Sequence, residues 1–228
     1  MLKRLFILCL CTATLAACAK RGAIGVSRLD TLNTQIERIF IATTRQKSET
    51  PYDFNGLRTS EITYGRYDIS IPPTQEVGKI EWPRAKPNPA TDFVIKDAEI
   101  FPSDAAFRSA VKTSNHASTN KEEVIVFIHG YKNNFAENLY RFAQITSDIG
   151  TQSTSVLYAW PTTESTVEYL HDRDSVLFAR DGLQTLLQKV AKTGVKRILL
   201  VAHSIGSSLL LETLRQVNIS NDRTVLNT

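Results

Sequence analysis

The sequence of 228 residues contains no cysteine after position 18, because its three cysteines are Cys9, Cys11 and Cys18. The rest of the chain therefore has no thiol with which to form a disulfide. Dense runs of basic residues are also missing: the net charge is +4, from 27 basic and 23 acidic residues. This mild balance gives no support for nucleic-acid binding.

Cofactor motifs are absent as well. The sequence has no glycine-rich phosphate loop, and its four histidines lack the spacing of metal ligands, so we expect no metal, nucleotide or other cofactor. The hydrophobic fraction of 42% is enough to form a packed core in one large α/β domain or two small ones. Nothing in the sequence indicates an oligomeric state.

The N-terminus has the pattern of an export signal. Lys3 and Arg4 precede an apolar stretch over residues 5–15, which is too short to remain as a membrane-spanning helix. Small residues follow it at Ala16 and Ala17. This order predicts a secretory signal peptide over residues 1–17.

Leu15-Ala16-Ala17-Cys18 resembles a bacterial lipobox. The resemblance implies cleavage before Cys18, acylation of that cysteine, and attachment to a membrane surface without a spanning helix. Residues 18–34 would form the anchor and a polar tether, and residues 35–228 the domain. Ala19, in place of an aspartate, favours the outer membrane of the bacterial envelope. The alternative is an ordinary signal peptide with an incidental cysteine.

Apolar runs alternate with amphipathic stretches in the second half of the chain. The runs at 124–128, 155–160 and 197–202 predict buried strands, and the stretches 135–149, 172–192 and 205–217 predict helices. Earlier strands are expected over 36–43, 61–71 and 93–100, and a short helix over 104–113. Polar loops are expected over 46–59 and 74–89. Together they predict an α/β fold: a mostly parallel sheet with helices on both faces.

Ser204 follows the last of these strands within Ala202-His203-Ser204-Ile205-Gly206. This pattern is related to Gly-x-Ser-x-Gly, in which small residues two positions before and after the serine let the strand turn sharply into a helix. We expect Ser204 to be a catalytic nucleophile and the amide of Ile205 to donate to an oxyanion at the helix start. The alternative is that Ser204 serves only as a helix N-cap.

A second oxyanion donor is expected in the loop 129–134, which follows the strand over 124–128. Gly130 permits a tight path there, and the amide of Tyr131 is the candidate.

Segments of the chain resemble the DUF900 family of bacterial α/β-hydrolases, which is grouped with lipase-like and esterase-like proteins. They are 39–45, 64–72, 127–133, 157–161, 172–175 and 202–206. The resemblance implies the α/β-hydrolase fold and hydrolysis of an ester or acyl substrate by an acyl-enzyme mechanism.

A catalytic acid and histidine are missing from the expected places. In α/β-hydrolases both follow the nucleophile, each after a later strand, but only 24 residues follow Ser204 and they contain no histidine and no further apolar strand. The histidines that precede Ser204 offer weak candidates. His203 should face away from the serine, His129 should bond local backbone, His171 could approach the rim of the sheet, and His116 lies in a polar stretch.

We therefore expect a truncated α/β-hydrolase, of the serine carboxylic-ester hydrolase type, without its C-terminal strands. The strand over 197–202 would then have an open apolar edge. One alternative is a non-catalytic binding or scaffold protein, anchored to a membrane, on the same fold. Another is an active hydrolase completed by a second chain or by an unusual base such as His171.

Overall fold

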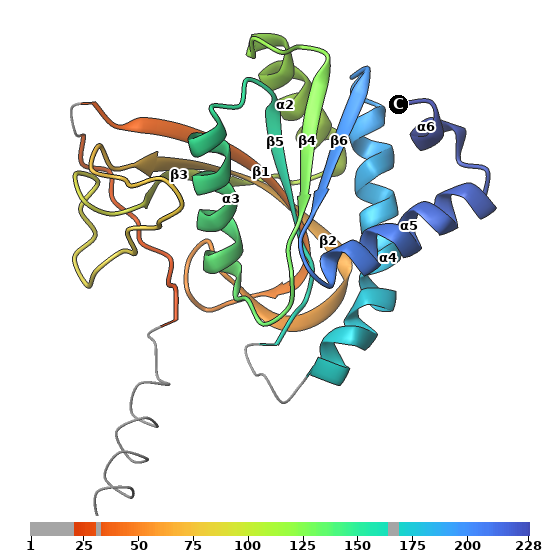
Figure 1. The fold of residues 1–228 in the computed structure, drawn as a ribbon, viewed down its shortest axis with the longest axis horizontal. Helices are drawn as coiled ribbons and strands as arrows, with labels where there is room; N and C mark the ends of the chain where they lie inside the picture. The colour runs from red at the N-terminus through yellow and green to blue at the C-terminus, as the bar shows by residue number, and fades with distance from the viewer. Residues whose placement is uncertain (1–20, 31–32, 164–168) are drawn as a thin grey trace, which may run out of the picture.

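The apolar segments of the chain form one six-stranded sheet with helices packed around it (Figure 1). The computed structural model describes residues 21–30, 33–163 and 169–228, leaving out the side chains of 169–171. The strands are β1 (Gln35–Lys47), β2 (Phe54–Ile71), β3 (Val94–Ile100), β4 (Glu123–Ile128), β5 (Thr154–Ala159) and β6 (Arg197–Ala202). The helices are α2 (Asp104–Ala117), α3 (Phe135–Ile149), α4 (Tyr169–Ala191), α5 (Gly206–Ile219) and α6 (Arg223–Leu226).

The strand order is β3-β2-β1-β5-β4-β6. Pairing is parallel between β1 and β5, β5 and β4, and β4 and β6, whereas β2 pairs antiparallel with β1 and β3. Parallel pairing needs crossover helices, and α3 and α4 connect these strands as the alternation of apolar runs and amphipathic stretches predicted. The predicted α/β fold with a mostly parallel sheet is confirmed.

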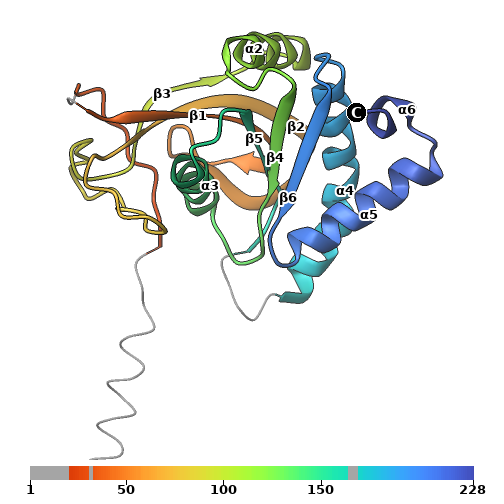
Figure 2. The same cartoon turned by 45° about the horizontal axis from the view of Figure 1, so that its top comes forward.

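Helices cover both faces of this sheet (Figure 2). One core cluster joins the sheet to α2, α4 and α5, and the other joins it to α3. Because β4 and β5 lie between both layers, their side chains are buried on both faces, which explains why these segments are apolar throughout.

The stretch 46–59, predicted as a loop, is mostly strand. β2 begins at Phe54 and pairs with β1 through Phe54–Lys47 and Arg58–Arg45, so only a short turn remains between the two strands. Antiparallel pairing satisfies the backbone groups of this segment while many of its polar side chains stay in solvent. Polarity alone therefore misplaced the start of β2.

β6 lies at an edge of the sheet. Its side chains Ile198, Leu200 and Ala202 pack against the cluster that contains α4 and α5. On the face that carries α3, Leu199 is 45% exposed and Val201 is 38% exposed. The predicted open apolar edge is therefore present among the described residues.

The segment 21–27, expected to be part of a tether, lies against the domain. Ile95 N donates to Gly25 O at 2.8 Å, Ser27 N donates to Ile95 O at 3.1 Å, and Gly25 N donates to the Tyr140 hydroxyl at 3.0 Å. The predicted signal peptide and Cys18 lie outside the described residues. Within the described ranges, no helix is both long enough and apolar enough to cross a bilayer.

Candidate active site

Ser204 lies in a tight turn between β6 and α5. Its φ is 55°, in the left-handed region that residues other than glycine rarely adopt, at a cost on the order of 1–3 kcal/mol. The turn is fixed on both sides, because His203 N donates to Ile128 O and Gly206 N donates to His203 O, both at 3.0 Å. The surrounding backbone thus holds Ser204 in a strained conformation, and Ser204 is exposed to solvent.

The capping alternative for Ser204 is wrong. Helix α5 begins at Gly206, its N-cap residue is Ile205, and no side chain caps the first turn. An N-cap serine has an extended backbone and accepts a hydrogen bond from the first turn, and Ser204 does neither. Its backbone strain needs another explanation.

Gly206 shows why a small residue is needed two positions after the serine. A Cβ at Gly206 would lie 2.8 Å from Ile128 O and still closer to His129 O. Both oxygens belong to the backbone at the end of β4, so they have little freedom to move away. Ala202, the small residue two positions before Ser204, lies on the inner face of β6 and pairs with Ile128.

The loop that follows β4 lies directly beside the serine. A Cβ at Gly130 would be 3.2 Å from Ser204 Cβ and 2.9 Å from His203 Nδ1. Tyr131 comes next in this loop and Ile205 directly follows Ser204, so the two predicted oxyanion residues belong to two segments that meet at Gly130 and Ser204. Among the described residues, no acceptor binds the amide of Ile205.

His129 is a structural residue buried beneath this loop. Its ring stacks on Trp160 with centroids 5.3 Å apart, its Nδ1 donates to Gly130 O at 2.6 Å, and Trp160 Nε1 donates to His129 O at 2.8 Å. Burial is the main cause that holds the pKa of His129 well below its usual value, and the nearby Arg45 charge acts in the same direction. The expected bond to local backbone is confirmed.

The other histidines do not complete a triad in the described part of the chain. No hydrogen bond joins the Ser204 hydroxyl to a histidine among the described residues. His203 is exposed beside Gly130, and His116 is exposed on the last turn of α2 rather than in a loop. The side chain of His171 lies outside the described residues.

Residues 103–228, from the start of α2 through the Ser204 turn, match the family described as alpha/beta hydrolase of unknown function (DUF900). The chain belongs to the DUF900 family. No curated protein and no solved structure gives a significant match. The match confirms the family resemblance of the segments from 127 to 206, whereas the segments 39–45 and 64–72 lie outside the matched residues.

Two buried charged residues of this DUF900 protein hold the loop 129–134 from different sides. From β1, Arg45 donates through Nη2 to Asn133 O at 2.8 Å and through Nε to Trp160 O at 2.9 Å. From α4, Asp172 accepts hydrogen bonds from Lys132 N at 3.3 Å and from Thr163 N at 2.7 Å. Both residues are almost inaccessible to solvent.

Neither Arg45 nor Asp172 was predicted from the sequence to be a site residue. The available signals were the 39–45 and 172–175 segments of the family resemblance, which contain Arg45 and Asp172. Across the described ranges, no group of three or more His, Cys, Asp or Glu residues has the geometry to hold a metal ion. The structure brings the strained Ser204 together with the backbone of Gly130.

Proposed function

We propose that this DUF900 protein is a serine hydrolase that cleaves carboxylic esters through an acyl-enzyme, with Ser204 as the nucleophile. The observation that carries the proposal is the left-handed conformation of Ser204, held between Gly130 and Gly206. A sharp strand-to-helix turn exposes the hydroxyl at the carboxyl end of the sheet, where substrates bind in α/β folds.

In the proposed reaction, Ser204 Oγ attacks the ester carbonyl carbon, and the amides of Ile205 and Tyr131 stabilise the oxyanion. The tetrahedral intermediate then loses the alcohol, and water releases the acid from the acyl-serine. The proton of Ser204 must pass to a base and then to the alcohol. Without a base, such sites retain about 10³–10⁴-fold acceleration over water.

A second candidate function is a non-catalytic binding protein on the same fold. It is favoured by the lack of a hydrogen bond between Ser204 and any histidine of the described residues. An organophosphonate probe separates the two, because it labels serines that are activated. Labelling of the full chain that is lost in Ser204→Ala and kept in Ser207→Ala supports the hydrolase, and intact folded protein without labelling supports the binding protein.

We also propose that Cys18 is acylated and anchors the protein to the surface of a bacterial membrane, the outer membrane being the expected one. The support is the lipobox-like Leu15-Ala16-Ala17-Cys18 behind a short apolar signal. Palmitate labelling of cells that express the chain should depend on Cys18. Label that persists in Cys18→Ala would contradict the anchor.

A further inference from the structure

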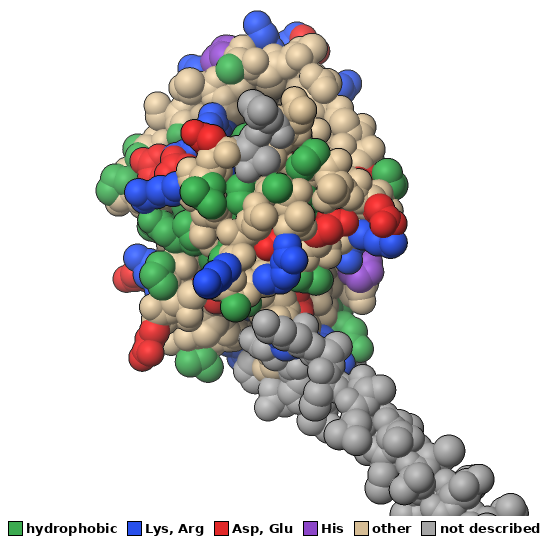
Figure 3. Space-filling view, turned by 90° about the vertical axis from the view of Figure 1, so that its left-hand side faces the viewer, with side chains coloured by type: hydrophobic (Ala, Val, Ile, Leu, Met, Phe, Trp, Pro, Cys, Tyr) green, Lys and Arg blue, Asp and Glu red, His purple; other side chains and the backbone are tan. Residues whose placement is uncertain are grey.

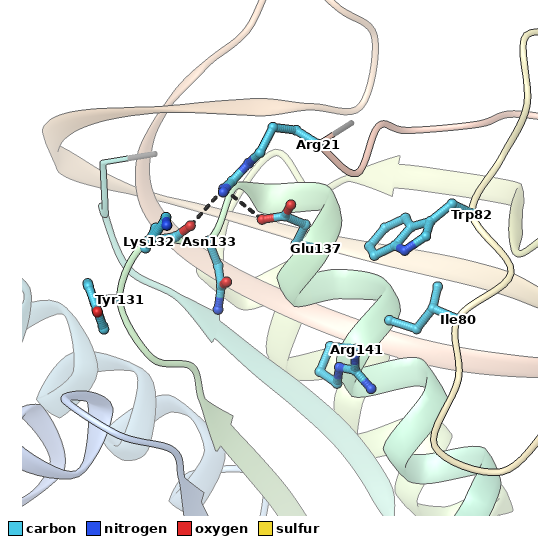
Figure 4. A pocket seen from close by; sticks show the side chains of 8 residues that line it. All are labelled: Arg21, Ile80, Trp82, Tyr131, Lys132, Asn133, Glu137 and Arg141. Atoms are coloured by element: carbon cyan, nitrogen blue, oxygen red, sulfur yellow. Dashed lines mark hydrogen bonds and ion pairs between the residues drawn. The ribbon is translucent and has the colours of Figure 1, made fainter. Parts of the chain in front are cut away.

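The segment that begins at Arg21 is bound to the candidate oxyanion loop. Arg21 Nη2 donates to Lys132 O and to Glu137 Oε2, both at 2.7 Å (Figure 4). Gly22 N donates to Glu137 Oε1 at 3.2 Å, and Asn134 Nδ2 donates to Gly22 O at 2.7 Å. The start of the described chain therefore has a fixed position at the rim of the site.

Glycines let this segment pass between α3 and the insertion over 72–93. A Cβ at Gly22 would lie 2.7 Å from a ring atom of Trp82, and a Cβ at Gly25 would lie 2.7 Å from Pro83 Cγ. Figure 1 shows the segment beside this insertion. Its path leaves no room for a free tether between residues 21 and 27.

A cavity of about 360 Å³ opens next to these contacts. Its lining includes Arg21, Lys132 and Arg141, with Ile80, Trp82 and Tyr131 around them. Figure 4 shows Arg141, Ile80 and Trp82 facing one another across it, with Tyr131 further along the loop toward β4. The cavity thus adjoins the loop that flanks Ser204.

The charge of this cavity is positive. Its one acid, Glu137, is paired with Arg21. Arg141 is exposed and donates to neutral oxygens, Gly78 O at 3.2 Å and Gln144 Oε1 at 2.6 Å. Within the described residues, no carboxylate lies within ion-pairing distance of Lys132 or Arg141, although the charge of Arg141 is near enough to Asp148 to contribute to the lowered pKa of that carboxyl. An anionic group fits this arrangement.

Apolar side chains are exposed on the insertion beside the cavity. Val77 is 82% exposed and Trp82 is 39% exposed, and Lys79, which lies between them in the sequence, is exposed and ion-paired with Glu76. Figure 3 shows hydrophobic side chains interspersed with both basic and acidic side chains over this face. Aromatic and basic side chains around exposed apolar residues are typical of surfaces that contact lipid headgroups.

Cys18 precedes Arg21 by three residues. Three residues of fully extended chain span at most about 11 Å. An acyl anchor on Cys18 would therefore hold Arg21, and with it the cavity, against the headgroup layer of the bilayer.

We propose that the cavity binds the phosphate of an anionic phospholipid in the anchoring membrane, and that the site hydrolyses an acyl ester of that lipid. This inference rests on the proposed acylation of Cys18 and on the proposed hydrolysis by Ser204. The acyl group is transferred from the lipid to Ser204, and the lysophospholipid leaves with a hydroxyl that takes up the proton of Ser204. Water then releases the fatty acid from the acyl-serine. Lys132 and Arg141 hold the phosphate and Trp82 enters the interface.

The two tryptophans provide the first test, because Trp160 is fully buried and Trp82 is half-exposed. The acylated, processed protein with Ser204→Ala is reconstituted into vesicles of phosphatidylcholine and phosphatidylglycerol that carry brominated acyl chains. We expect quenching of tryptophan fluorescence that disappears in Trp82→Phe. Anchored protein without quenching overturns the proposed orientation, and so does a lack of acylation.

The second test concerns the phosphate. The same Ser204→Ala protein in detergent is titrated with dihexanoyl phosphatidylglycerol, dihexanoyl phosphatidylcholine or inorganic phosphate, and Trp82 fluorescence is the readout. We expect tightest binding of phosphatidylglycerol and about fivefold weaker binding in Arg141→Gln. Lys192→Gln, with the same charge change at the far end of α4, should bind like the parent protein. Equal affinity for inorganic phosphate, or no effect of Arg141→Gln, overturns the lipid site.

The outcomes separate this inference from the proposed function. Both binding tests use Ser204→Ala, so they support or overturn the lipid site even if the protein hydrolyses nothing. If the parent protein hydrolyses a soluble ester while the Ser204→Ala variant shows neither quenching nor lipid binding, that outcome supports the proposed serine hydrolase activity and overturns the proposed lipid substrate.

Discussion

Gly206 packs so closely against the carbonyl oxygen of His129 that a side chain at position 206 would overlap it. Gly206→Ala should therefore push α5 away from β4 and lower the free energy of unfolding by about 3 kcal/mol. Urea denaturation measures this loss. Ser208→Ala, on the exposed face of the same helix turn, is the control and should change stability by about 0.5 kcal/mol or less. Equal stability of the two variants would contradict the packing.

The strain at Ser204 predicts opposite effects of one substitution on stability and activity. Glycine adopts a φ of 55° without penalty, so Ser204→Gly should raise the free energy of unfolding by about 1 kcal/mol while it removes the hydroxyl. Ser204→Ala keeps the Cβ and should bring no such gain. Thermal denaturation of the two variants checks this. A less stable Ser204→Gly would show that the turn is relaxed in solution.

Asp172 offers two acceptors to two different amides, Lys132 N and Thr163 N. In Asp172→Asn the side-chain amide has only one acceptor oxygen. Its NH₂ group would therefore face one of the two backbone N–H groups, and that hydrogen bond would be lost. We expect a loss of about 2 kcal/mol in stability and about a tenfold drop in kcat/KM per folded molecule, because the loop 129–134, which carries the proposed oxyanion donor, shifts.

Asp174→Asn is the matched control for Asp172, because it makes the same change at an exposed position two residues away. Its stability and its kcat/KM should equal those of the parent. If Asp172→Asn loses stability but keeps its kcat/KM on a p-nitrophenyl ester, Asp172 supports the fold without positioning the loop.

His129 predicts how stability depends on pH. Burial holds its pKa below the usual value in the folded protein, so between the folded and unfolded pKa values the unfolded chain binds the extra proton. Its contribution is fully present above about pH 6.5 and is lost as the pH falls toward the folded value. His129→Gln should reduce this slope in urea denaturation between about pH 7.5 and 5.5. The exposed His116→Gln should leave it unchanged.

The sequence predicted the turn around Ser204 well because its requirements are local. Small residues at Ala202 and Gly206 are needed within one turn of the chain, and the apolar run before them identifies the strand. The alternation of apolar runs and amphipathic stretches predicted the sheet for the same reason. In most of these segments the positions that are apolar in the sequence are the positions that are buried in the fold.

Contacts between distant segments could not be predicted. Arg45 and Asp172 contact the loop 129–134 from positions 88 and 40 residues away in the sequence, and Arg21 contacts it from 111 residues away. A charged residue in a polar stretch gives no sign of a partner at that separation. The start of β2 was missed for a related reason, since its pairing with β1 decides its conformation.

β1 lies between β2 and β5, inside the sheet, although it precedes the region that matches the family. It contributes Ile39 and Ile41 to the core, and Thr43 Oγ1 donates to Ala159 O at 2.6 Å. A fragment that starts at Ser103 would lack these groups and leave β5 unpaired along one side. The limits of sequence similarity are therefore not the limits of an autonomous folding unit, and a recombinant protein cut at the family boundary would lack part of its own interior.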